Sequence, residues 1–560
     1  MEGKQEQGKK GIAKKVRLGF AISAVATAMV LGSCGISDAF KIDTGNPDLT
    51  LRWDQSFRYT LMDRLMGRDG KILGDPNSDD GDRNFDPGIV SNRLDLLSEM
   101  DLIYKKYYGI RVSAAAWTDF RYLQGFDNSS ASTYNQIVNG HPAVGLSEFG
   151  DRHFESGGEL LDAFAFAKYD AGSIPIYFKV GRHMNFWGEA LLSAFHGISY
   201  SQGPLDLAKA TSQPGVQAKE VFRPENQFSF STQVTPTLTL MGQCFFQWER
   251  DFAPEDGTYF ASSDLLLKSP GVLWAAPGVY YSHNKDITPD DVGDFGIGLR
   301  WTPESTAFGN GAAIGVFYRR FSDRLPQVVL DTSTSSYRYM YADGIDLAGI
   351  SYAASIFGLS LGAEFSYRHN MPLISGAAVV TSSDQLPDCG ETLGARGDTI
   401  HALVNLVGLL KKTPLWDAGN WNIEMAYSRW LDVTEHEDVF LGRSSYKGFN
   451  RVTKDNGVIA ANFTPQWLQV MSGVDVSMPI TGNIGMWGVS AVTDGGGVGD
   501  GSWGVGLQFD IFNKYQVLLN YVDFFGRLHA DPSTGGLYAK GSNAALRDRD
   551  FIALTVKIPF

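Results

Sequence analysis

Serine hydrolases combine a serine, a histidine and an acid, so histidines near serines are the first residues to consider for catalysis. The candidate histidines are His153, His183, His196, His401 and His436. None of these five lies beside a serine in a nucleophile pattern such as Gly-x-Ser-x-Gly, and with many serines in the chain, chance proximity is expected. We therefore expect no enzyme and no cofactor, and a barrel hydrolase is the least favoured alternative.

The acidic stretch from Asp75 to Asp86 suggests a second kind of chemistry, because Ca²⁺ prefers carboxylate and carbonyl oxygens. An EF-hand loop needs glycine at its sixth position, and counting from Asp75 or from Asp80 places Asp80 or Phe85 there. We therefore interpret the stretch as a solvated loop and predict no metal site. An irregular cation site in such a loop is the alternative.

The elements that must position these side chains follow a period of two residues. Between Ser502 and Ile511, large apolar side chains alternate with glycines and polar residues, and segments 50–60 and 358–368 do the same. Strands of about 10 residues with aromatics near their ends are typical of outer-membrane barrels, although alternation alone also fits a large soluble β-protein. The spacing of the strands has to decide between the two.

The gaps between the predicted strands alternate between short and long. The predicted strands are 50–60, 92–104, 107–122, 159–169, 174–182, 227–234, 237–249, 293–301, 312–320, 347–356, 358–368, 398–409, 420–430, 457–464, 466–478, 502–511, 515–524 and 549–560. Short gaps carry turn residues, for example at Pro465, whereas Ile484–Ala491 also alternates but is assigned to a loop to keep the strand number even. The pattern predicts an all-β fold, a single transmembrane antiparallel up-and-down β-barrel of about 18 strands, with short periplasmic turns and long extracellular loops.

The two ends of the chain carry addressing signals. A basic segment and the apolar run Leu18–Gly32 precede small residues that end at Ala39, which predicts a signal peptide over 1–39 that is cut after Ala39. The barrel would then span 40–560, in the outer membrane of a Gram-negative bacterium. A lipid-modified Cys34 in a lipobox-like sequence is the alternative to that cut. The last predicted strand ends in Phe560 and resembles the insertion signal that barrels present to their insertion machinery; a soluble edge strand that ends in Phe by chance is the competing interpretation.

Charge and cysteine content exclude other classes. The formal net charge is −14 and no basic patch offsets it, so we expect no nucleic-acid partner. Cys244 and Cys389 show no metal-ligand spacing, and a disulfide between them stays open.

Charged residues of the predicted strands are expected to face the lumen, because charges on the lipid face are costly. The predicted pore-lining residues are Arg52, Arg93, Arg111, Arg121, Lys179, Glu249, Glu364, Arg368, Glu424 and Asp510. They would select solutes by charge, or they would form a mutually neutralising ladder that stiffens the wall.

The long loop that begins near Gly181 is a candidate constriction of the pore. Its predicted constriction residues are Arg182, Phe186, Trp187, Glu189 and Phe195. The alternative is a packed plug or surface loop in which Arg182 and Glu189 form a structural ion pair.

Several short blocks resemble a family of Gram-negative outer-membrane proteins, the domain-of-unknown-function family numbered 1302. The blocks are Asp43–Leu49 with Arg52–Asp54, Asp80–Phe85 with Ser91–Asp95, Gly181–Arg182 with Trp187–Glu189, Gly257–Phe260, Arg324–Pro326, and Ser366–Arg368 with Asn370 and Pro372. The resemblance implies an outer-membrane barrel of unsettled role. It also implies a connection to a periplasmic partner protein, an inner-membrane exporter and hydrophobic cargo.

We expect a porin-like channel for the passage or handling of a small hydrophobic molecule. A polar-solute porin, or a structural or docking barrel for a periplasmic transport partner, is the alternative. The expected partners are outer-membrane lipid, the barrel insertion machinery, and the periplasmic partner with its inner-membrane exporter.

Overall fold

The computed structural model describes residues 40–128, 132–138, 141–172, 174–266, 271–276, 278–532 and 535–560. The predicted signal peptide, its cut after Ala39 and the alternative at Cys34 concern residues outside these ranges. Within the described residues, no helix is both long enough and apolar enough to cross a membrane. Cys244 and Cys389 are both free thiols, so the disulfide is not formed.

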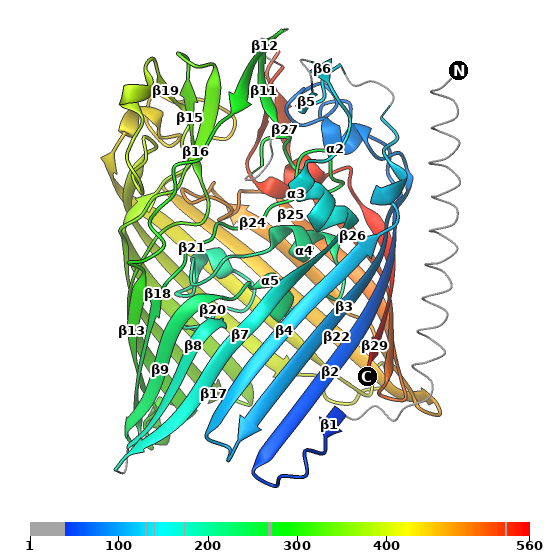
Figure 1. Ribbon diagram of the computed structural model, residues 1–560, viewed down its shortest axis with the longest axis vertical. Helices are drawn as coiled ribbons and strands as arrows, with labels where there is room; N and C mark the ends of the chain where they lie inside the picture. The colour runs from blue at the N-terminus through cyan, green and yellow to red at the C-terminus, as the bar shows by residue number, and fades with distance from the viewer. Residues whose placement is uncertain are drawn as a thin grey trace.

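Within the described residues, eighteen antiparallel strand positions close into one barrel, as predicted (Figure 1). The strands are β2 (Leu49–Arg64), β3 (Gly88–Tyr104), β4 (Tyr108–Asp119), β7 (Ser156–Ala171), β8 (Ile174–His183), β9 (Glu225–Thr235), β10 (Leu238–Phe245), β13 (Phe295–Trp301), β14 (Asn310–Phe321), β17 (Ile345–Ile356), β18 (Leu359–Pro372), β20 (Arg396–Leu409), β21 (Ala418–Glu435), β22 (Asp455–Met471), β23 (Val474–Ser477) with β24 (Ile480–Trp487), β25 (Gly501–Ile511), β26 (Tyr515–Phe525) and β29 (Phe551–Pro559). Pairing of β29 with β2 closes the wall, and the short strand β1 (Phe40–Ile42) pairs with the first part of β2.

One pair of predicted strand boundaries is wrong. Strand β22 runs straight through Pro465, whose carbonyl accepts a hydrogen bond from the backbone N–H of Met478 at 3.0 Å. The turn lies at Ser472–Gly473 instead, where Gly473 has a φ of +73° that suits glycine. The next strand position is shared by β23 and β24, so part of the stretch that was assigned to a loop, Ile484–Ala491, is strand.

The outer face of the wall is apolar. On β13, Phe295, Ile297, Leu299 and Trp301 are 41%, 48%, 43% and 39% exposed, and the residues between them are two glycines and an arginine. On the neighbouring β14, Val316 and other apolar side chains continue this exposed face, whereas the residues that alternate with them are buried. The period of two seen in the sequence is therefore the alternation between the outside and the lumen of the barrel.

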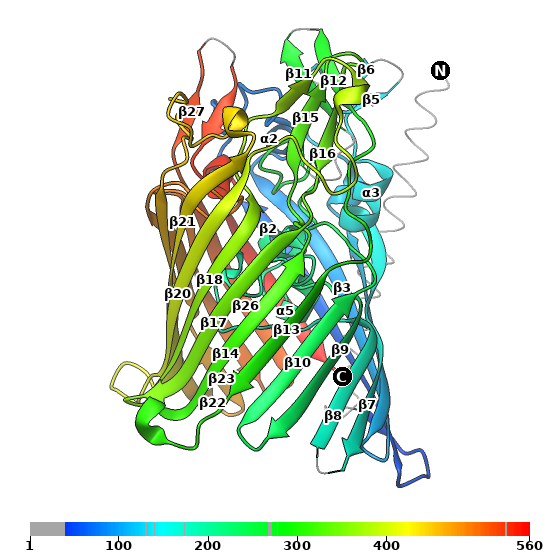
Figure 2. The ribbon, with the colours of Figure 1, turned by 90° about the vertical axis from the view of Figure 1, so that its left-hand side faces the viewer.

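Short turns join the strands at one end of the barrel and long loops join them at the other (Figure 2). The long loops contain a five-stranded sheet that the sequence did not predict, which stands above the barrel in Figure 1. Its strands are β11 (Val272–Ala276), β12 (Val279–His283), β15 (Gln327–Asp331), β16 (Ser336–Met340) and β19 (Ala378–Val380). Two small hairpins complete the loop strands: β5 (Ile137–Val138) with β6 (His141–Pro142), and β27 (Leu528–Ala530) with β28 (Leu537–Ala539).

In the described part of the chain, the helices are all short and lie between strands. They are α2 (Asp80–Arg83), α3 (Glu148–Gly150), α4 (Leu207–Ser212) and α5 (Ala218–Val221), with the π-turn η3 (Asp151–Glu155) and the 3₁₀ turns η2 (Tyr122–Gln124), η4 (Ala194–His196), η5 (Thr306–Phe308), η6 (Ser383–Gln385), η7 (Glu437–Val439) and η8 (Ser542–Leu546).

The interpretation of Asp75–Asp86 as a solvated loop is wrong. Asp79, Asp80 and Asp82 are fully buried, and the aromatic ring of Phe85 packs between those of Tyr122 and Tyr259. Other long loops fold over this stretch, so that it forms part of the core above the barrel rather than its surface.

Candidate functional site: the lumen and its inserted loop

Residues 184–224, which join β8 to β9, fold into the barrel and cross its lumen (Figures 1 and 2). We call this segment the inserted loop. It carries η4, α4 and α5, and both views show α5 inside the outline of the barrel wall. The loop approaches the wall closely at Gly188, whose φ is +92° and where an added Cβ would collide with the carboxylate of Glu364. Glycine is therefore needed at the point of contact.

Two buried glutamates of the wall bind the backbone of the inserted loop. Glu364 on β18 accepts hydrogen bonds from the N–H groups of Glu189, Ala190 (2.8 Å) and Ile198 (2.6 Å). Carboxylates that accept several backbone N–H bonds form strong, charge-assisted contacts, so Glu364 fixes the loop against the wall.

Glu424 on β21 does the same for the next residues of the loop. It accepts the N–H groups of Leu191 at 2.7 Å, Leu192 at 2.9 Å and Ser193 at 2.5 Å. The side chain of Asn405, on β20 between the two glutamates, donates to the carbonyl of Glu189 at 2.6 Å. Three adjacent strands thus hold one short run of loop backbone.

Arginines of the same wall satisfy the loop's carbonyl groups. Arg319 on β14 donates to the carbonyls of Ile198 at 2.8 Å and Tyr200 at 2.6 Å. Arg368 on β18 donates to the carbonyls of Phe195 and Gly197 at 3.0 and 3.1 Å. At the Gly197–Ile198 peptide, Arg368 binds the carbonyl and Glu364 binds the N–H, so a positive and a negative wall residue hold the same peptide group.

The later part of the inserted loop is held by the opposite wall. Arg58 on β2 donates to Gln213 at 2.6 Å and pairs with Glu220 at 3.2 Å. Lys209 and Arg223 of the loop both pair with Glu159 on β7. The loop thus spans the barrel from β18 and β21 to β2 and β7.

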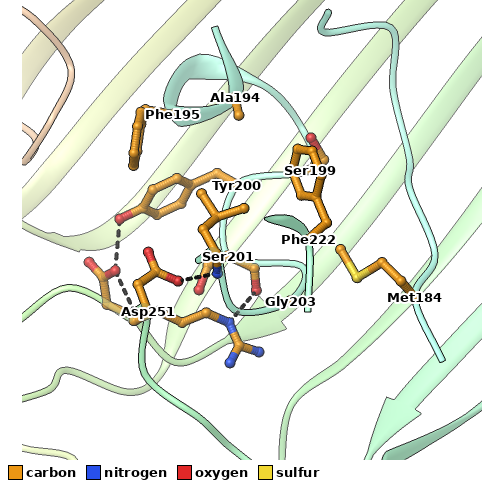
Figure 3. Close-up of a pocket in the computed structure, with 12 residues that line it drawn as sticks. Met184, Ala194, Phe195, Ser199, Tyr200, Ser201, Gly203, Phe222 and Asp251 are labelled. Atoms are coloured by element: carbon orange, nitrogen blue, oxygen red, sulfur yellow. Dashed lines mark hydrogen bonds between the residues drawn. The ribbon is translucent and has the colours of Figure 1, made fainter. Parts of the chain in front are cut away.

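A small hollow lies where the loop turns under the long loops (Figure 3). The hydroxyl of Tyr200 donates to Asp323 at 2.7 Å, and the backbone N–H of Leu205 donates to Asp251 at 2.8 Å. Burial raises the pKa of Asp251 to about 7. The hollow has a volume of about 20 Å³, which is room for about one water molecule, so it is not a passage.

A larger cavity of about 250 Å³ lies between the inserted loop and the wall formed by β22 and β24. Leu192 and Phe195 line it from the loop, and Val458, Ile459 and Ile484 line it from the wall. Asparagine, serine, threonine and aspartate side chains and His196 also line it. This is where the loop leaves room beside the wall.

The predicted constriction residues all belong to the inserted loop or its root, but they lie in different surroundings. Trp187 is buried against Phe317 of β14, and Phe195 borders both cavities. Phe186 is 54% exposed and packs edge-on against Phe222 within the loop.

The ion pair between Arg182 and Glu189 is not formed. Arg182 pairs with Glu249 at 3.2 Å and Glu189 pairs with Arg300 at 3.4 Å. The chain turns towards β18 at Gly188, which carries Glu189 away from the end of β8.

The predicted pore-lining residues fall into three groups. Glu364, Arg368 and Glu424 bind the inserted loop, as described above. A second group forms contacts within the wall itself. Its ion pairs are Arg93 with Asp95, Arg111 with Glu99, Asp101 and Asp162, and Arg52 with Asp54. In the same group, Lys179 lies over the ring of Phe164, and Asp510 accepts a hydrogen bond from Gln508. Arg121 and Glu249 lie beyond the strand ends, where Arg121 pairs with Asp127 and Glu249 with Arg182. A role in selecting solutes stays a prediction for all of them.

Sequence reasoning missed two features of the lumen. Arg319 occupies a buried position of β14 between two exposed ones. The period of two that predicted Arg368 to face the lumen would also have predicted this for Arg319. His183 and Ser229 meet on β8 and β9, with Nε2 and Oγ 2.7 Å apart, while the histidine's Nδ1 faces the carbonyl of Gly181 rather than an acid. Both side chains are buried, so the pair is closed to a substrate.

Among solved structures, those compared here are distant in sequence. The crystal structure of Pseudomonas aeruginosa OccD3 (OpdP) is 10% identical, with a TM-score of 0.39 and coverage of 91% of each chain. The crystal structure of P. aeruginosa OpdK with vanillate is 10% identical, with a TM-score of 0.38. The match covers 91% of this chain and 98% of the OpdK chain. Both are too distant to say how this chain works. Among curated proteins, none matches.

The sequence itself gives a firmer answer. The model of a family described as "Protein of unknown function (DUF1302)" matches residues 20–560, which is nearly the whole chain and agrees with the resemblance of the short blocks. The chain is therefore a member of the DUF1302 family.

Proposed function

We propose that this chain is an outer-membrane channel that passes or handles a small, largely apolar molecule, with its lumen narrowed by the inserted loop. The apolar outer face of the barrel supports the membrane location, because a contiguous exposed apolar surface is stable in lipid and costly in water. The alternation of short turns and long loops supports an orientation with the long loops outside the cell.

The attachment of the inserted loop to Glu364 and Glu424 is the observation that carries the proposal. It places the loop across the lumen and leaves a cavity beside β22 and β24. The apolar part of that cavity, which includes Leu192 and Phe195, supports a small apolar cargo more than a stream of hydrated ions.

Single-channel recording in planar bilayers tests the proposal. The intact protein is compared with a variant that lacks residues 186–200 and with Glu304→Gln, a control at an exposed turn residue. We expect the intact protein and the control to be nearly silent and the deletion variant to conduct, because the loop then no longer crosses the lumen.

Large steady steps in the intact protein would mean an open polar-solute porin and would contradict the proposal. Silence of both proteins would favour a structural or docking barrel for a periplasmic partner. For the hydrolase alternative, labelling of Ser229 by a fluorophosphonate is the test, and we expect none because His183 and Ser229 are buried.

A further inference from the structure

Four buried polar residues from three different long loops meet above the barrel. Asp79 and Asp80 come from the β2–β3 loop, Asn135 from the β4–β7 loop and Asp264 from the β10–β13 loop. All four are fully buried, and carboxylate oxygens of the three aspartates lie within 4.8 Å of one another. Figure 1 shows α2, which begins at Asp80, beneath the upper loops.

Hydrogen bonds between described residues hold all three aspartates in place, and for Asp79 and Asp80 they use one of the two carboxylate oxygens. Oδ2 of Asp80 accepts the backbone N–H of Asn135 at 2.8 Å, and Oδ2 of Asp264 accepts the backbone N–H of Asp80 at 3.2 Å. Oδ2 of Asp79 accepts from Thr133 at 2.8 Å and from Arg83. Among the described residues, Oδ1 of Asp79 and Oδ1 of Asp80 are buried without a hydrogen-bond partner.

Asn135 supplies a second, independent observation. Its Nδ2 donates to the carbonyl of Val272 at 2.7 Å, which leaves Oδ1 as the other atom of the amide. That Oδ1 is also buried without a hydrogen-bond partner in the described part of the chain. An added Cβ at Gly271 would lie 3.3 Å from Cβ of Asn135, 3.1 Å from a carboxylate oxygen of Asp256 and 3.0 Å from the carbonyl of Asp264. Asn135 thus lies beside the acidic residues and carries a neutral buried oxygen that no described residue uses.

This arrangement is unfavourable without a cation. Within the described ranges, no lysine, arginine or histidine forms an ion pair with Asp80. Asp79, at the edge of the group, pairs with Arg83. Buried carboxylates that repel one another bind either protons or a metal ion. A bound cation turns the unfavourable repulsion between their negative charges into a favourable attraction to the ion.

We propose that Asp79, Asp80, Asp264 and the amide oxygen of Asn135 bind one Ca²⁺ ion that ties three long loops together above the barrel. Hard oxygen ligands favour Ca²⁺ or Mg²⁺ over softer metals. Ca²⁺ binds carboxylate and amide oxygens at about 2.3–2.6 Å, and these are the ligand types that the four side chains offer. Mg²⁺ binds at shorter distances and usually keeps several waters, for which a fully buried site is poorly suited. The site is separate from the lumen, so it does not depend on the channel proposal.

Calorimetric titration of the full-length protein in detergent tests the site. The protein is stripped with EDTA, dialysed and titrated with CaCl₂, and in a second experiment with MgCl₂. We expect one Ca²⁺ per chain with a dissociation constant of about 10⁻⁴ M, as in other extracellular sites, and weaker binding of Mg²⁺. No saturable heat with Ca²⁺, or tighter binding of Mg²⁺ than of Ca²⁺, would overturn the proposal.

Variants locate the site. Asp80→Asn combined with Asp264→Asn keeps the shapes but removes two charges, and we expect Ca²⁺ to bind about 100-fold more weakly. Asn135→Ala removes a neutral ligand only and is the milder change, with an expected loss of about tenfold. Asp290→Asn, at an exposed aspartate of the β10–β13 loop, is the matched control and should bind as the wild type does. Wild-type affinity in both site variants would show that the ion binds elsewhere and would overturn the assignment.

Discussion

The barrel holds two groups of buried carboxylates that are satisfied in different ways. In the lumen, Glu364 and Glu424 each accept three backbone N–H groups of the inserted loop. In the loops above, Asp79 and Asp80 each keep one buried oxygen for which no described residue donates a hydrogen bond. Each lumen glutamate thus has three donors within the chain, whereas each loop aspartate has described donors for only one of its two oxygens.

The difference shows what a buried carboxylate requires. Backbone N–H groups supply partial positive charge that is fixed in place, and a carboxylate with several of them is stable in a buried position. Where such donors are missing, the charge has to be balanced from outside the chain. The lumen glutamates therefore act as structural anchors, whereas the loop aspartates form a binding site.

The largest expected effect comes from removing a lumen anchor. Glu424→Ala leaves the N–H groups of Leu191, Leu192 and Ser193 without their acceptor. We expect the segment from 186 to 200 to lose about 3–6 kcal/mol of local stability, at ~1–2 kcal/mol for each orphaned group. Hydrogen exchange of that segment measures the loss, with Glu304→Gln as the control. Unchanged exchange in Glu424→Ala would show that the glutamate does not anchor the loop.

The strand pattern predicted where the lumen residues lie but not what they bind. Alternation placed Glu364, Arg368 and Glu424 inside the barrel, because the wall is a local structure with a period of two. The partners of these residues were not predictable, because the hydrogen bond from Ala190 to Glu364 joins residues 174 apart in the sequence. The sequence of an inserted loop has no period from which its contacts could be predicted.

The acidic stretch shows the same limit in another form. Asp80 drew attention to Ca²⁺ in the sequence, but the stretch does not match the EF-hand pattern. That pattern is local, however, whereas Asn135 and Asp264 approach Asp80 from two other loops. Burial of the stretch depends on packing against residues such as Tyr259, which no spacing within the stretch reveals.

Glu255 is intermediate between the lumen glutamates and the loop aspartates. It is buried and accepts the N–H and the hydroxyl of Ser147, each at 2.7 Å, yet burial raises its pKa from 4.5 to about 7. Because the folded pKa is raised, its contribution to stability is complete below the unfolded value of 4.5 and is lost as the pH rises to about 7. At pH 8, Glu255→Gln should therefore stabilise segment 141–155 by up to about 3 kcal/mol, and at pH 4.5 by almost nothing.

Hydrogen exchange of segment 141–155, normalised to the intrinsic rate at each pH, measures this effect. Glu148→Gln, at an exposed glutamate of the same segment, is the control. A stabilisation that is equal at both pH values would show that hydrogen bonding rather than charge is responsible.

The proposed calcium site should respond to pH in a related way. Protons compete with Ca²⁺ for Asp80 and Asp264, whose pKa values are raised by burial and by their neighbours. We expect Ca²⁺ to bind more weakly at pH 5.5 than at pH 8, by about tenfold for one proton displaced over one pH unit within the titration range. Titration calorimetry in buffers of different ionisation enthalpy measures both the affinity and the number of protons released. Equal affinity at both pH values with no proton release would contradict protonation of the site.

The smallest effect is expected where a paired carboxylate is exposed to solvent. Glu148 pairs with Arg152 at 2.5 Å on the surface of the β4–β7 loop, and their side chains are 83% and 71% exposed. Water already stabilises both charges, so Arg152→Ala should change the stability of this segment by less than about 0.5 kcal/mol. Exchange of segment 141–155, measured beside Glu255→Gln, gives the value. A loss comparable with that of a lumen anchor would mean that charge pairing, rather than burial without donors, separates the two groups of carboxylates.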